Sequence, residues 1–159
     1  MGTGKSRTAI ELARLRQDKI SHVLWCCPVS LKETIKQEIL KHTNCNEADI
    51  CVFDSKTNER NLPDTTWYIA GIESVSSSDR VALTVNHLIN ECSLVIVDES
   101  SFIKGHQSMR TKRLTLFAKC ARYRLILTGT PISQGIVDLF AQMRFLSPKI
   151  GLRVFLFVC

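Results

Sequence analysis

Short apolar runs recur along the chain and are separated by polar or amphipathic segments. The runs predict strands at His22–Cys27, Ile50–Phe53, Trp67–Ala70, Leu94–Val97 and Arg124–Leu127. Apolar and polar residues do not alternate within them, which is typical of parallel strands buried on both faces. Trp25 and Trp67 lie inside two of these runs, so we expect both side chains to pack in the core.

Between the strands, apolar residues recur at helical spacing. Helices are predicted over residues 6–17, 31–40, 79–91, 108–120 and 135–146. Polar or glycine-containing stretches at 54–64, 71–78 and 128–131 predict loops and a turn. Alternation of strands and helices predicts right-handed crossovers and one α/β domain with a mostly parallel sheet.

Composition fits an ordinary globular domain, with 45% hydrophobic and 23% charged residues among 159. Lys and Arg total 21 against 15 Asp and Glu, and the net charge of +6 permits contact with a polyanion. Two interpretations stay open for a basic segment near residue 120, a solvated helix face and a nucleic-acid track. Its members are Arg110, Lys112, Arg113, Lys119, Arg122 and Arg124.

The seven cysteines contain no C-x-x-C pair, which favours reduced thiols packed as small hydrophobes over a zinc site. An N-terminal helix with acidic and basic residues argues against a signal peptide. No apolar tract reaches the ~20 residues of a membrane span. We therefore expect a cytoplasmic protein without a membrane partner.

The chain opens with the residues MGTGKS, which match the end of a phosphate-binding loop. Glycines allow several backbone N–H groups to face one phosphate, and the following helix directs its positive end at the same anion. Lys5 would then reach the β- and γ-phosphates, and the Ser6 hydroxyl would ligate Mg²⁺. A glycine turn with Ser6 as helix cap is the simpler alternative. The same letters also fit an N-myristoylation pattern, although Gly-Lys-Ser favours phosphate binding.

Two further strands end in polar residues. Leu94–Val97 leads into Asp98 and Glu99, and Leu125–Leu127 leads into Thr128-Gly129-Thr130-Pro131. Carboxyl ends of parallel strands meet at one sheet edge, where ligands bind in open α/β folds. Asp98 is suited to hold Mg²⁺, and Glu99 to orient and deprotonate an attacking water. Solvated acids opening a loop and an ordinary Gly-Pro turn are the alternatives.

Six segments of the chain, taken in order, resemble the motifs of superfamily-two helicases. These segments are MGTGKS, VLWCCPVSL, IAGIESV, LVIVDESSFIKG, LILTGTPI and DLFAQMRFLSP. The Swi/Snf-type branch, related to DEAD/DEAH-box helicases and including phage-encoded members, is the most similar. This resemblance implies a three-layer RecA-like P-loop NTPase lobe with a mostly parallel sheet and its first strand missing. It implies ATP and Mg²⁺ as cofactors and DNA as partner, held by backbone contacts to a duplex.

The resemblance also implies roles for individual residues. Nucleotide binding would involve Gly2, Thr3, Gly4, Lys5 and Ser6; Mg²⁺ would be held by Ser6 and Asp98; catalysis would involve Lys5, Asp98 and Glu99. Coupling of hydrolysis to movement would involve Thr128, Gly129 and Thr130, and nucleic-acid contact would involve Pro28, Ser30, Leu31, Glu73 and Ser74. Lys104 matches a lysine that follows the acidic box. Ser100 and Ser101 stand where relatives often carry a small residue and His, and Ile72 stands where an aromatic residue is common.

Compared with that family, we expect residues 1–148 to form an N-terminal lobe truncated at its start. A second RecA-like lobe, with an arginine finger, would follow Pro148. Residues 149–159 instead form an apolar tail of unknown role, for which a frameshift is one explanation.

The expected function is the ATP-binding lobe of a DNA-dependent helicase or translocase, associated with the nucleoid or encoded by a phage in a bacterial host. A non-catalytic nucleotide- or DNA-binding remnant is the alternative for this chain alone. A small-molecule kinase is a third possibility, against which Asp98-Glu99 and the TGTP turn argue.

Overall fold

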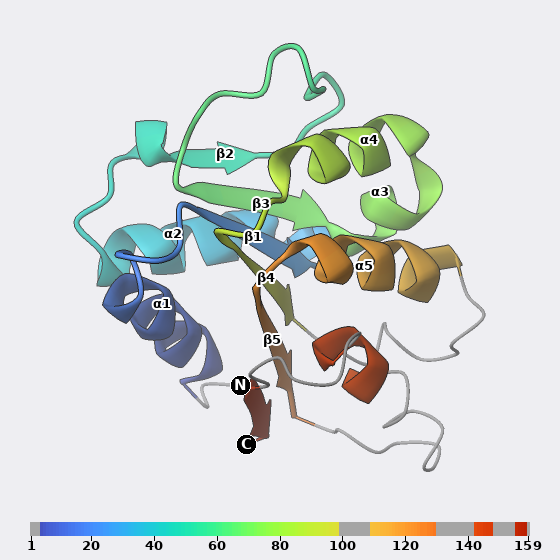
Figure 1. Cartoon of the computed structure of the whole chain (residues 1–159). Helices are drawn as coiled ribbons and strands as arrows, with labels where there is room; N and C mark the ends of the chain where they lie inside the picture. The colour runs from blue at the N-terminus through green and yellow to red at the C-terminus, as the bar shows by residue number, and fades with distance from the viewer. Residues whose placement is uncertain (1–3, 99–108, 130–141, 148–154, 159) are drawn as a thin grey trace.

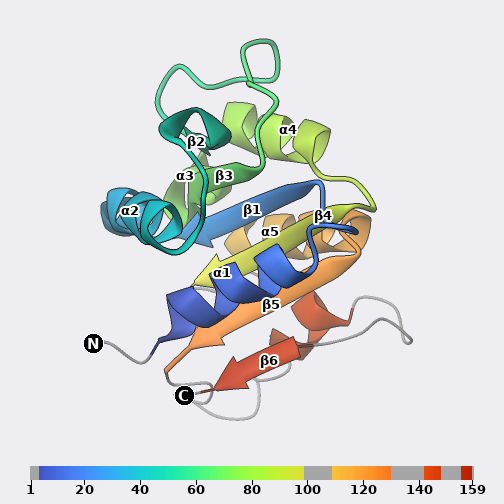
Figure 2. The same ribbon diagram turned by 90° about the vertical axis from the view of Figure 1, so that its left-hand side faces the viewer.

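The strands that the structure describes form one parallel sheet. A computed structural model describes residues 4–98, 109–129, 142–147 and 155–158 of the chain. The strands within these ranges are β1 (His22–Cys27), β2 (Ile50–Val52), β3 (Trp67–Gly71), β4 (Ser93–Asp98), β5 (Tyr123–Thr128) and β6 (Phe155–Val158). Their order across the sheet is β2-β3-β1-β4-β5-β6, and every neighbouring pair is parallel. Figure 2 shows the strands of the lower half pointing in one direction.

Helices cover both faces of the sheet. One face carries α1 (Lys5–Leu15) and α2 (Lys32–His42), and the other carries α3 (Ile72–Ser77), α4 (Asp79–Leu88) and α5 (Met109–Cys120) (Figure 1). Two short 3₁₀ turns, η1 (Val29–Leu31) and η2 (Glu47–Asp49), precede α2 and β2. Residues 142–146 are also helical. The predicted three-layer α/β fold with a mostly parallel sheet is confirmed.

Strands β1 to β5 contribute alternate side chains to two separate cores. On the α1/α2 face, Trp25 and Ile69 pack with Ile10 and Ile39. On the other face the buried side chains include Leu24, Tyr68, Val95, Val85, Leu114 and Phe117. Burial on both faces explains why the strands are apolar throughout. Trp25 and Trp67 are both buried, as predicted.

One predicted loop is wrong. Residues 71–78 are rich in serine, but the structure has helix α3 at Ile72–Ser77. Ile72 and Val75 are completely buried in the core, and this tertiary contact overrides the weak helix propensity of the serines. Ser76 and Ser77 donate to the Glu73 carbonyl at 2.7 and 2.9 Å, which keeps their hydroxyls bonded inside the helix.

Strand β6 is an element that the sequence pattern did not predict. It pairs with β5 in the register Leu125↔Phe155 to Thr128↔Val158. Its carboxyl end therefore lies at the same sheet edge as Asp98 and Thr128.

Among the described residues, no helix is long and apolar enough to span a bilayer.

Candidate functional site

The carboxyl ends of the strands bring together residues from four separate motifs. The register pairs Cys27 with Gly71 between β1 and β3, and Asp98 with Leu127 between β4 and β5. Asp98 is only 8% exposed and Thr128 is fully buried. Open α/β folds bind ligands at this edge, so the strand ends form the candidate site.

Helix α1 starts at this edge, directly after Gly4. Gly4 adopts φ 70° and ψ 6°, a left-handed conformation that favours glycine. Its carbonyl accepts hydrogen bonds from the Thr8 N–H and the Thr8 hydroxyl at 2.9 and 3.0 Å. Ser6 lies within the first turn of α1, so the alternative in which Ser6 is the N-cap is wrong; Gly4 holds that position.

Lys5 lies beside the end of β5. A Cβ atom built on Gly129 would be 3.4 Å from the Lys5 Nζ atom. Two segments that are distant in sequence, the glycine-lysine-serine segment and the TGT segment, therefore meet at the sheet edge. That 3.4 Å distance is an ordinary van der Waals contact, so the ammonium group of Lys5 lies directly against the backbone at the end of β5.

Several predicted site residues fall outside the described ranges. These are Gly2, Thr3, Glu99, Lys104 and Thr130.

Cys27 occupies the end of β1, in the same row as Asp98. Burial raises the pKa of its thiol to about 12, and the negative charge of Asp98 acts in the same direction. Lys32 opposes this shift and Glu73 reinforces it, so charges from three elements reach this thiol. Cys27 is therefore a neutral, buried group at neutral pH.

The neutral, buried state of Cys27 agrees with the prediction of thiols packed as small hydrophobes, which also holds for Cys26. Cys92 and Cys120 are exposed, so the prediction is wrong for them.

The two segments predicted to contact nucleic acid lie against each other. The Val29 N–H donates to Glu73 Oε2 at 3.0 Å. A Cβ atom on Gly71 would lie only 2.5 Å from Val29 Cγ2, so glycine permits this close approach. Residues 28–31 are half-buried or exposed at the edge, and the Val29 side chain is 43% exposed.

The positively charged side chains of the basic segment near residue 120 differ in their burial and in their partners. Lys112, Lys119 and Arg122 are exposed. Arg124 is 2% exposed and donates to the carbonyls of Ala118, Ala121 and Leu146, so its assignment to a solvated face or a nucleic-acid track is wrong. Arg113 bonds the Val75 carbonyl at 3.1 Å and the carboxylate of Asp79, which links α5 to α3 and α4.

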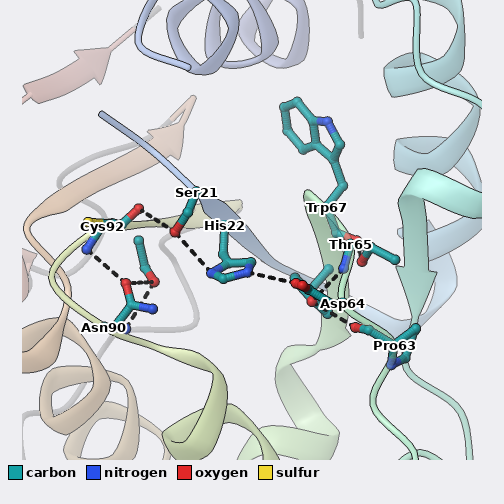
Figure 3. Close-up of polar contacts among 10 residues, drawn as sticks. Ser21, His22, Pro63, Asp64, Thr65, Trp67, Asn90 and Cys92 are labelled. Carbon is teal, nitrogen blue, oxygen red and sulfur yellow. Dashed lines mark hydrogen bonds and ion pairs between the residues drawn. The ribbon is translucent and has the colours of Figure 1, made fainter. Parts of the chain in front are cut away.

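At the opposite, amino edge of the sheet, Figure 3 shows a chain of polar contacts around His22. His22 Nδ1 lies 3.1 Å from Ser21 Oγ, and His22 Nε2 lies 3.2 Å from Asp64 Oδ1. The Asp64 side chain is 96% exposed, unlike the buried acid that orients a catalytic histidine. The contacts instead join β1 to the segment before β3. Sequence reasoning found no role for His22, because Asp64 is far from it along the chain.

Comparison with known proteins agrees with this architecture. The chain matches the SNF2-related domain family over residues 1–156. It is 27% identical over 150 residues to the human DNA annealing helicase and endonuclease ZRANB3, covering 94% of this chain and 14% of that protein. It is 28% identical over 151 residues to a Caenorhabditis elegans SWI/SNF-related matrix-associated actin-dependent regulator of chromatin subfamily A-like protein 1 homolog, covering 94% and 21%. The chain thus spans between a seventh and about a fifth of the length of these relatives.

A solved structure with the same fold is the Sulfolobus solfataricus SWI2/SNF2 ATPase core in complex with dsDNA. Its TM-score is 0.74 at 24% identity, over 93% of this chain and 30% of that one. The helicase domain of Pyrococcus furiosus Hef superposes with a TM-score of 0.72 at 16% identity, over 100% and 33%. Both likenesses confirm the RecA-like helicase fold. Together with the match over almost the entire sequence, they establish that the chain belongs to the SNF2-related domain family.

Proposed function

We propose that this chain is the ATP-binding lobe of a DNA-dependent ATPase that translocates along DNA or unwinds it. The observation that carries this proposal is the meeting of Lys5, Gly129 and the buried ends of β4 and β5 at one sheet edge. Family membership supports the same assignment. The lobe predicted from the sequence is residues 1–148, β6 adds residues 155–158 to its sheet, and a second RecA-like lobe would complete the enzyme.

In this proposal the nucleotide lies against the start of α1. Backbone N–H groups of Gly2, Thr3 and Gly4 and the first turn of α1 would surround the phosphates, because a helix N-terminus attracts anions. Lys5 would neutralise the β- and γ-phosphates. Glu99 would accept a proton from the attacking water.

Ser6 and Asp98 have the hard oxygen ligands that suit Mg²⁺. Among the described residues, no group of three or more His, Cys, Asp and Glu side chains could hold a metal ion. Nucleotide phosphates and water would therefore provide the remaining ligands, as is usual for Mg²⁺. The bound ion would supply positive charge at the transferring phosphate.

DNA would bind where residues 28–31 approach α3. Pro28, Ser30, Leu31, Glu73 and Ser74 belong to this surface, and the solved neighbour in complex with dsDNA supports duplex DNA as the partner. Thr128, Gly129 and Thr130 follow both Lys5 and the residues of this surface in the order of motifs, and they would couple hydrolysis to movement. An ATPase of this kind would act on DNA in the nucleoid or during phage infection.

Nucleotide binding to the purified chain tests the proposal. We expect calorimetry with ATP and Mg²⁺ to detect binding that Lys5→Ala weakens at least tenfold. Lys19→Ala, at an exposed position before β1, is the matched control and should bind as the parent chain does. Equal affinity for all three proteins would contradict the assigned nucleotide site. DNA-stimulated ATP turnover after addition of a second lobe would extend the test to catalysis.

A further inference from the structure

A polar pocket lies beside the surface formed by residues 28–31 and α3. Its volume is about 260 Å³, enough for roughly eight waters at about 30 Å³ each. Lys32, directly after η1, and Arg80, in the first turn of α4, provide cations. The hydroxyl-bearing residues that line it are Ser55, Ser74, Ser77 and Ser78.

Both cations have hydrogen-bond donors left for a ligand. Lys32 Nζ donates to the Phe53 carbonyl at 2.6 Å, and an ammonium group has three donors. Arg80 Nη2 lies 3.4 Å from the Asp54 carbonyl. Within the described residues, Arg80 Nη1 is buried without a hydrogen-bond partner. A buried guanidinium donor without a partner is costly, so a bound oxygen ligand would stabilise this arrangement.

The hydroxyl groups add neutral donors. Ser78 Oγ accepts from the Val81 N–H at 3.4 Å as the cap of α4, which leaves its own hydrogen for a ligand. Ser77 donates to the Glu73 carbonyl and is already used. The cap also directs the positive end of α4, a ten-residue helix, toward the pocket.

Among the described residues that line the pocket, Asp54 is the one with an acidic side chain. Its Oδ1 accepts from the Lys56 N–H, the Thr57 N–H and the Thr57 hydroxyl, each at 2.8 Å. The hydrogen bond from Thr57 is the main cause that lowers the Asp54 pKa, so the carboxylate is charged at neutral pH. Lys32 and Arg80 carry two positive charges against the one negative charge of Asp54, so these lining residues have a net positive charge.

We propose that this pocket binds a phosphate group between Lys32 and Arg80. Two cations with spare donors and nearby hydroxyls match the tetrahedral oxygen acceptors of phosphate. Lys32 adjoins Leu31, and Ser74 belongs to both the pocket and the proposed DNA surface. A backbone phosphate of DNA is one source of this group and free phosphate is the other. The DNA source rests on the proposed function.

Two titrations test the pocket. In ¹⁵N NMR at low salt, inorganic phosphate should shift the amide signals of Ser77 to Val81, and Lys32→Met/Arg80→Met should abolish these shifts. With a short DNA duplex, the same double variant should reduce the slope of log K against log salt by about 0.9, since one phosphate contact is lost. Lys32→Arg/Arg80→Lys, which keeps both charges, should retain both effects and separates charge loss from misfolding.

The matched control is Lys19→Met/Lys41→Met, which removes two exposed positive charges near the amino edge. Equal slopes for this control and the pocket variant would exclude DNA as the source. Phosphate shifts without a slope difference would assign free phosphate. A parent chain that shows phosphate shifts but binds no DNA would contradict the proposed function and support the pocket. Absence of both effects in the parent chain would overturn the pocket.

Discussion

The backbone N–H of Val29 donates a 3.0 Å hydrogen bond to Oε2 of Glu73, a residue 44 positions further along the chain. This bond fixes the turn after β1 to the helix after β3. Glu73 would therefore support the proposed DNA surface by holding residues 28–31 in place. A carboxylate that faced the DNA directly would instead repel the phosphate groups of the DNA.

Removing this carboxylate tests the distinction. Glu73→Ala should lower the free energy of unfolding by about 1–2 kcal/mol and speed hydrogen exchange at the Val29 amide, because a bond to a charged acceptor is lost. Glu73→Gln keeps an acceptor and should lie close to the parent chain in both measurements. If Glu73 faced DNA phosphates directly, Glu73→Ala would instead tighten DNA binding and leave the Val29 exchange rate unchanged.

The contact between Gly71 and Val29 can be tested by a double-mutant cycle. Gly71→Ala should destabilise the chain by about 1–3 kcal/mol, because the new methyl group would overlap Val29 Cγ2. Val29→Ala removes that atom, and the double variant should recover most of the loss. Urea unfolding of the four proteins gives the interaction energy. If the losses in unfolding free energy of the two single variants simply add in the double variant, the contact with Val29 does not restrict the side chain at position 71.

Arg124 and Arg122 form a matched pair of arginines, one buried and one exposed. Arg124→Met should lower the free energy of unfolding by about 2–4 kcal/mol, because buried carbonyls of Ala118, Ala121 and Leu146 lose their donors. Arg122→Met should change it by less than about 0.5 kcal/mol, as for most surface changes. Equal effects in thermal or urea unfolding would refute the structural role of Arg124.

The Cys27 thiol should make the free energy of unfolding depend on pH in the alkaline range. Its pKa is about 12 in the folded chain, against 9.0 for an ordinary thiol, so above pH 9 the unfolded chain loses this proton first. The stability that comes from this group is fully present below pH 9 and falls as pH rises toward 12.

Cys27→Ala should therefore flatten the loss of unfolding free energy above pH 9, by up to about 1.4 kcal/mol per pH unit. Cys92→Ala, at an exposed position, serves as the control and should leave the slope unchanged. Urea unfolding at pH 8, 9 and 10 measures the slopes. Parallel curves for the parent chain and Cys27→Ala would show that this thiol ionises alike in both states.

Much of the fold follows from local patterns. Five strands and the meeting of Asp98 and Thr128 at one edge could be predicted, because buried parallel strands are apolar throughout and share a direction. Helix α3 could not, since its six residues contain only Ile72 and Val75 as buried apolar positions, too few to reveal a helical period. The burial of Arg124 could not be predicted either, because the carbonyl groups that it bonds belong to three separate places. These are Ala118 in α5, Ala121 directly after α5, and Leu146. Contacts such as Val29–Glu73 and Lys5–Gly129 depend on strand order, which local spacing does not encode.

Among the described strands β1 comes first in sequence, yet it lies inside the sheet, between β3 and β4. During synthesis, β1 can pair with β3 once residues 67–71 have left the ribosome, but its other edge stays open until residues 93–98 follow. That open edge belongs to a strand whose last five residues are all buried in the final fold. An exposed apolar edge invites pairing with other chains. Slow translation between residues 71 and 93 would therefore prolong the period in which this apolar edge can pair with other chains.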